Sequence, residues 1–141
     1  MTRLKQRSHA IAALPLIQYI HDIATKAVLD LPALMRSEAG TVKIYVENFA
    51  DIETLNSLRM TDKYDLLGLY RGTPLPVKSV FLGIDLEDSI FLYRCPLVRY
   101  AYENNESIDT LIKHVVTHEL GYHFGHNRYD KDENKNSPHI D

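Results

Sequence analysis

Apolar residues recur at three- and four-residue intervals in the first part of the chain, which is the spacing of one face of an α-helix. That face is formed by Leu16, Ile17, Ile20, Ile23, Ala24, Ala27, Val28 and Leu31. We expect this amphipathic helix to end near Leu31 and Pro32. From Thr41 to Phe49 the pattern changes to alternation of apolar and polar residues, which predicts a half-buried strand.

The middle of the chain has no sustained period. Residues 51–83 mix short apolar pieces with turn-forming residues, including Gly72, Pro74 and Pro76, so we expect a loop with short pieces of structure. Ser89 to Arg94 is a compact run of β-prone residues and predicts a second strand. Pro96 then opens a short helix, because its missing amide proton costs nothing in the first turn.

A second long helix is predicted over residues 108–124. Ser107 is a suitable N-cap, Asp109 complements the positive end of the helix dipole, and Gly125 is placed to end the helix. Residues 126–141 hold few apolar side chains and many charges, so we expect a polar, solvated and partly disordered tail.

Composition limits the classes of protein to which the chain can belong. Its 141 residues, 45% hydrophobic and 25% charged, predict a single globular domain over residues 1–141 that needs no metal merely to fold. A net charge of -3 argues against nucleic acid as a partner, and no apolar stretch is long enough for a membrane span. The single cysteine, Cys95, fits a reducing compartment, and we expect a cytoplasmic protein.

Histidines concentrate in the second long helix and directly after it. Four of the seven lie between His114 and His126. At 100° per residue Glu119 falls inside the apolar face of this helix, where a carboxylate is costly unless it is paired. His118 and Tyr122 lie on the shoulder of the same face, so this placement favours a functional site.

The string HELGYH is a variant of the motif HExxH. In that motif two histidines four residues apart share a zinc ion, and the glutamate acts as general base on a zinc-bound water. His118 and Glu119 keep their positions, but Tyr122 holds the place of the second ligand. His123 is rotated by about 140° from His118 and cannot simply substitute, so we interpret it as a core or supporting residue.

Three ordered blocks extend beyond this motif, namely DLLGLYRG at residues 65–72, IFLYRCP at 90–96 and HELGYHFG at 118–125. With VENFAD at 46–51, they make the chain resemble the small bacterial zincin-like metallopeptidases. The resemblance implies a minimal α+β zincin-like fold: a short mixed sheet, a backing helix and an active-site helix beneath a strand that can pair with an extended peptide. Residues 90–94 are our candidate for that strand.

The resemblance also implies zinc, a peptide or protein substrate and a third, acidic ligand. By spacing from His118 the third place falls on Arg128, which cannot bind a cation, so Asp130 and Asp132 are candidates, as is His114 one turn before the motif. Tyr122 is a poor ligand because its ordinary pKa is about 10.

Three functions remain open from the sequence. The first is zinc-dependent peptide-bond hydrolysis with Glu119 as general base, impaired by the change at Tyr122. The second is a catalytically inactive pseudoenzyme that binds a peptide or protein. The third is a metal-binding protein without hydrolytic activity, using His114, His118 and residues of the tail.

Overall fold

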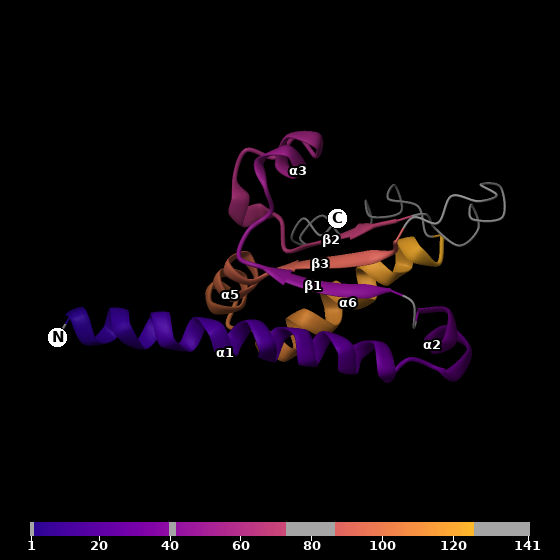
Figure 1. Ribbon diagram of the computed structural model, residues 1–141, viewed down its shortest axis with the longest axis horizontal. Helices are drawn as coiled ribbons and strands as arrows, with labels where there is room; N and C mark the ends of the chain where they lie inside the picture. The colour runs from indigo at the N-terminus through magenta and orange to yellow at the C-terminus, as the bar shows by residue number, and fades with distance from the viewer. Residues whose placement is uncertain (1, 40–41, 73–86, 126–141) are drawn as a thin grey trace.

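Helices surround a small sheet in the computed structural model, which describes residues 2–39, 42–72 and 87–125, with side chains from residue 16 onward (Figure 1). The helices are α1 (Thr2–Leu29), α2 (Ala33–Ala39), α3 (Ile52–Ser57), α5 (Arg94–Glu103) and α6 (Ile108–His123), with a 3₁₀ turn η1 (Lys63–Asp65). The strands are β1 (Lys43–Glu47), β2 (Gly68–Arg71) and β3 (Ser89–Tyr93). The predicted α+β class with a short mixed sheet is confirmed.

The strand order is β1-β3-β2. β1 runs parallel to β3 with Tyr45 opposite Phe91, and β2 runs antiparallel to β3 with Leu69 opposite the same residue. β3 is therefore the central strand, and both of its edges are occupied. The prediction that residues 90–94 pair with a substrate peptide is wrong for this reason. The edge strand that lies against α6 is β2.

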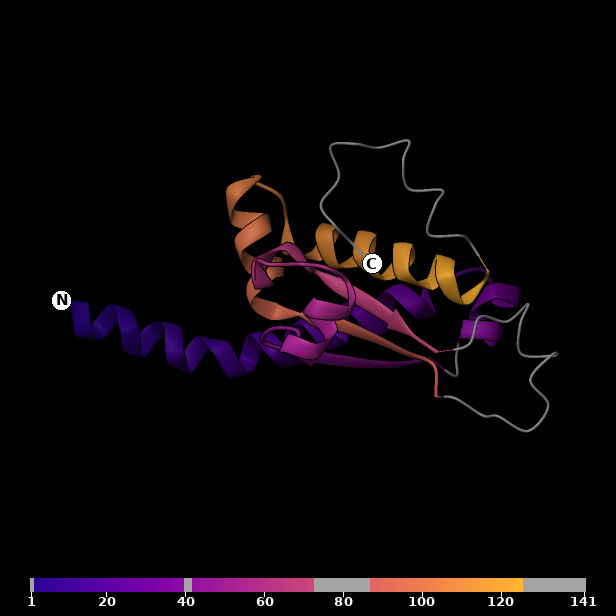
Figure 2. The ribbon, with the colours of Figure 1, turned by 90° about the horizontal axis from the view of Figure 1, so that it is seen from above.

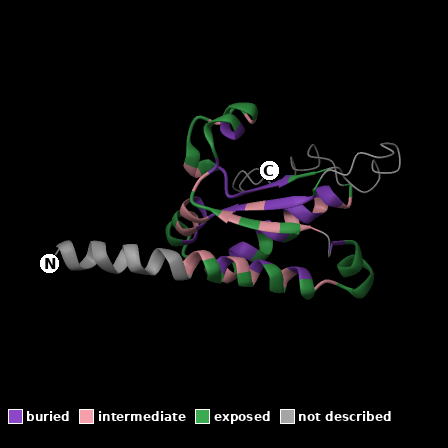
Figure 3. Cartoon of the chain, in the orientation of Figure 1, coloured by how far each residue is buried: buried purple, intermediate pink, exposed green. Residues whose placement is uncertain are grey.

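Side chains alternate between the two faces of the sheet and enter two apolar clusters. Ile90 and Leu92 point into the larger cluster, which is formed with α1 and α6. Tyr93 and Leu69 point the other way, into a smaller cluster with Leu55 of α3. Figure 2 shows α6 running along one side of the sheet, and in Figure 3 the buried residues gather on β3, β2 and α6. α6 is thus held against the sheet over most of its length.

Most predicted elements are present with shifted ends. α1 stops at Leu29 and begins at Thr2, well before the apolar stripe, and its first half extends beyond the sheet in Figure 1. α5 begins at Arg94, two residues before Pro96, which still leaves the proline in the first turn. Gly125 follows α6 with a φ of 97°, as expected for a residue that ends a helix. The predicted tail, residues 126–141, lies outside the described residues.

Ser107 is the N-cap residue of α6 as predicted, although its side chain makes no capping hydrogen bond. In residues 51–83 the predicted short structure is α3, η1 and β2 as far as residue 72. Among the described residues, no helix is long and apolar enough to cross a bilayer.

Candidate functional site

β2 and α6 meet at the motif residues, and a glycine permits the close approach. A Cβ on residue 68 would lie 2.6 Å from Cγ1 of Val115 on α6, well inside the separation at which carbon atoms pack. Two residues further along, the amide of Tyr70 donates a hydrogen bond to Oε1 of Glu119 at 2.9 Å. The edge strand therefore binds the motif glutamate directly.

Glu119 is fully buried, with none of its surface exposed. The helical wheel placed it on the inward face, and this orientation is confirmed. A buried carboxylate is costly without donors, and the Tyr70 amide is one donor that stabilises it. The same bond fixes the position of β2 above the helix.

His118 and Tyr122 face each other one helical turn apart. The Tyr122 hydroxyl oxygen lies 3.3 Å from Nε2 of His118, and the two rings are perpendicular with centroids 5.5 Å apart. In the neutral tautomer that carries its proton on Nδ1, the hydroxyl donates to the Nε2 lone pair that a zinc ion would use. Tyr122 is buried whereas His118 is half-buried, so the contact lies where the inward face of α6 meets its exposed flank.

Of the other candidate ligands, His114 is among the described residues and is not part of this contact. His114 is exposed on α6, and its ring stacks on that of His118 with centroids 6.5 Å apart. Asp130 and Asp132, like Arg128, lie outside the described residues. The site as described consists of His118, Glu119 and Tyr122, with β2 above them.

These residues do not fit a catalytic zinc ion. Such an ion needs three protein ligands and one open position. His118 can supply one ligand, and Tyr122 stands where the second belongs. Among the described side chains, those of residues 16–39, 42–72 and 87–125, no three histidine, cysteine, aspartate or glutamate residues come together as a metal site.

A buried polar network beside the motif was not predicted from the sequence. The Tyr70 hydroxyl donates to Oδ1 of Asp88 at 2.8 Å and lies 3.1 Å from Nδ1 of His123. Nε2 of His123 lies 3.1 Å from the Glu38 carbonyl, which can only accept, so this nitrogen carries a proton. Burial, and then the bond to Asp88, raise the pKa of Tyr70 above its ordinary value, so its hydroxyl stays protonated.

This network gives His123, which directly follows Tyr122, a structural role. His123 is fully buried, which confirms its interpretation as a core residue. Through Tyr70 it ties the end of α6 to the same strand residue whose amide binds Glu119. The spacing of His123 from His118 pointed to the core, but nothing in the sequence identified Asp88 as its neighbour.

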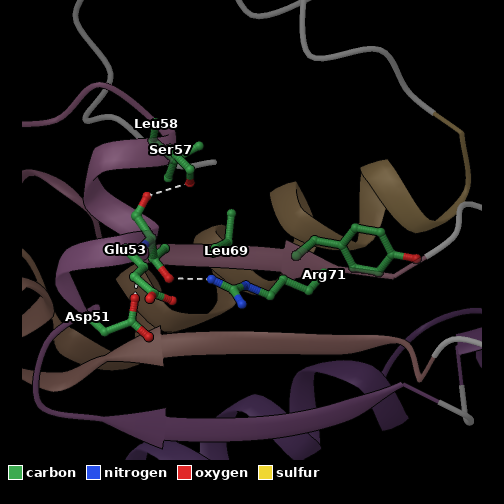
Figure 4. Close-up of a pocket in the computed structure, with 8 residues that line it drawn as sticks. Asp51, Glu53, Ser57, Leu58, Leu69 and Arg71 are labelled. Carbon is green, nitrogen blue, oxygen red and sulfur yellow. Dashed lines mark hydrogen bonds between the residues drawn. The ribbon is translucent and has the colours of Figure 1, made fainter.

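A hollow lies between α3 and β2, on the far side of β2 from the face of α6 that carries Glu119 (Figure 4). Its volume is about 480 Å³, and it is lined by Asp51, Glu53, Thr54, Ser57, Leu58, Leu69, Tyr70 and Arg71. Arg71 reaches from β2 toward α3 and donates to the Thr54 hydroxyl. Hydrogen bonds from Thr54 lower the pKa of Asp51, so this carboxylate is ionised at neutral pH.

The fold and the site define the class of protein: a small sheet with an edge strand above a helix that carries His-Glu and a residue in register for a second ligand. The sequence model of the zincin-like metallopeptidases matches residues 39–135. The chain belongs to this family. The match starts just before β1 and includes β2, β3 and α6. No curated protein shows significant similarity to the chain.

Proposed function

We propose that this chain is a zincin-fold module that binds a peptide or protein without hydrolysing it. The contact between the Tyr122 hydroxyl and Nε2 of His118, at 3.3 Å, carries the proposal. It replaces two imidazoles converging on a metal by a tyrosine that satisfies the remaining histidine. Membership of the family supports the interpretation of His118 and Glu119 as retained motif residues.

Binding is proposed to use the hollow between α3 and β2. A hollow of about 480 Å³ is within the usual range of ligand sites, and its rim combines apolar Leu58 and Leu69 with charged groups. The lining holds two carboxylates, of Asp51 and Glu53, against one guanidinium, that of Arg71, so its net charge is negative. We therefore expect a preference for peptides that place a basic side chain in the hollow.

Zinc-dependent hydrolysis is the second candidate, and the position of Glu119 favours it. Its carboxylate directly follows the motif histidine and lies beneath an edge strand, and the glutamate at that place in the HExxH motif acts as general base. The additional ligands would have to come from outside the described residues, with Asp130 and Asp132 as candidates.

Zinc stoichiometry separates the two functions. We predict that the purified parent chain binds no zinc tightly, whereas Tyr122→His gains at least about tenfold in zinc affinity, because a second imidazole joins His118 on one helix face. Tyr122→Phe is the matched control: it removes the hydroxyl without adding a ligand and should gain nothing. Isothermal titration and metal analysis measure both. Tight one-to-one zinc in the parent would overturn the pseudoenzyme proposal.

The preference of the chain for basic over acidic peptides tests whether the hollow is the binding site. In a binding screen the parent should favour lysine-containing peptides over their glutamate counterparts, and Glu53→Lys should reduce that preference by about tenfold because it reverses a charge on the rim. Glu103→Lys makes the same charge change on α5, outside the hollow, and should leave the preference intact. Equal preference in the parent and Glu53→Lys would exclude this location.

A further inference from the structure

β1 has an edge that is not used within the sheet. Among the described strands it is terminal and pairs with β3 alone, and Figure 1 shows it at the border of the sheet. The amide of Lys43 donates to the Asp88 carbonyl at 2.9 Å, so the backbone groups of Lys43 point toward β3. Because alternate residues turn their backbone groups to opposite edges, Ile44 and Val46 present theirs outward.

The surroundings of this edge are suited to a partner strand. A groove of about 440 Å³ runs between α1 and β1 and is lined by His21, Thr25, Val28, Leu29, Ala39 and residues 42–45. Leu29 and Tyr45 expose 57% and 39% of their surface there, which is large for apolar side chains beside a strand edge. β1 contains no proline, and its Lys43, a residue type that also protects edges, has a glutamate, Glu47, at the other end of the same strand.

The sequence of β1, KIYVE, is self-complementary when two copies run antiparallel. With Tyr45 opposite Tyr45 of the second copy, Lys43 lies opposite Glu47, and Ile44 lies opposite Val46. Both charged pairs are attractive, and the two aliphatic residues meet on the α1 side. Shifting the register by one residue places Lys43 opposite Val46 and loses both ion pairs.

We propose that this edge joins two copies of the chain into a symmetric dimer, with β1 of each copy antiparallel to the other and the two sheets continuous. The direction of the backbone groups supports the same register as the side-chain pairs. A register centred on Tyr45 makes Ile44 and Val46 a hydrogen-bonded pair, and these are the residues whose backbone groups face outward. The contact is the same patch on both copies, as two-fold symmetry requires.

Charge reversal tests the proposal through the association constant. Lys43→Glu and Glu47→Lys each place like charges opposite one another twice, so each should weaken dimerisation at least about tenfold. An equimolar mixture of the two variants should dimerise again, because the two lysines on β1 of one variant then face the two glutamates on β1 of the other. Sedimentation velocity over a wide concentration range measures all three samples.

Lys113→Glu and Glu103→Lys are the controls, since they make the same charge changes on exposed positions of α6 and α5. Both should dimerise like the parent, and circular dichroism should show each variant folded. If the parent chain stays monomeric at every concentration, the dimer proposal is overturned, and any strand that pairs with β1 must come from another protein. Variants that dimerise like the parent, or a mixture that does not recover, exclude the antiparallel register.

Discussion

On the proposed function, the single side chain of Tyr122 separates membership of the family from its catalytic activity. Residues four apart on a helix are neighbours, so a tyrosine in the ligand position still reaches His118 and still stabilises the turn. A tyrosine hydroxyl is a poorer ligand than imidazole at neutral pH, because the ordinary pKa of tyrosine is about 10 and the phenolate is scarce. On the proposed function, the chain keeps the arrangement of the motif residues while its affinity for zinc is lost.

Glu119 is expected to have a structural role that does not depend on catalysis. Its Oε1 accepts the buried Tyr70 amide. Glu119→Ala removes that acceptor and should lower the free energy of unfolding by about 2 kcal/mol or more, since a buried donor is left unsatisfied. Glu119→Gln keeps an acceptor oxygen and should stay within about 1 kcal/mol of the parent. Urea denaturation gives both values.

Hydrogen exchange at the Tyr70 amide is the accompanying measurement. The amide should stay protected in Glu119→Gln and exchange faster in Glu119→Ala. If the glutamine variant were as unstable as the alanine variant, the charge of Glu119, rather than its acceptor oxygen, would be what stabilises this contact.

At the scale of elements, β2 has only four residues but is held by three kinds of contact: strand pairing, close packing and side-chain hydrogen bonds. It pairs with β3, packs on α6 through Gly68, and binds Glu119 and Asp88 through the amide and the hydroxyl of Tyr70. Gly72, with a φ of 150°, follows its last residue at a point where a Cβ would collide with the Asp88 carboxylate. A short strand is therefore positioned more firmly than its length suggests.

Gly68→Ala tests this close approach. The added methyl group meets Cγ1 of Val115, so we expect a loss of about 1–3 kcal/mol in the free energy of unfolding. Val115→Ala removes the obstructing atoms, and the double variant should be more stable than the sum of the two single effects implies. A double-mutant cycle by denaturant unfolding measures the coupling. Strictly additive effects would show that the two residues do not constrain each other.

The sequence predicted the elements with a clear pattern and missed two short ones, α2 and β2. β1 and α6 follow from alternation and helical spacing, and β3 from a compact run of β-prone residues; the spacing of α6 also revealed the inward orientation of Glu119. β2 was not predicted as a strand because GLYR is too short to show alternation. The role of residues 90–94 was mistaken because strand order depends on tertiary contacts, which no local pattern contains.

At the scale of the whole molecule, the candidate site depends on contacts between distant parts of the chain. His118, Glu119 and Tyr122 share one helix, so their proximity could be predicted from spacing alone. The hydrogen bonds of Tyr70 with Glu119 and with His123 join residues that are 49 and 53 positions apart in the sequence. The bond between His123 and the Glu38 carbonyl joins residues that are 85 positions apart. These long-range bonds fix α6 beneath β2, and helical periodicity carries no information about them.

The strand order has a consequence for synthesis. β3 lies in the middle of the sheet but is the last of the three strands to be made, so β1 and β2 leave the ribosome without the strand that both of them need. α1 likewise packs on α6, which is made later still. A growing chain therefore exposes an apolar helix face and two unpaired strands until residues near 120 emerge, and that interval is when aggregation or a chaperone competes with folding.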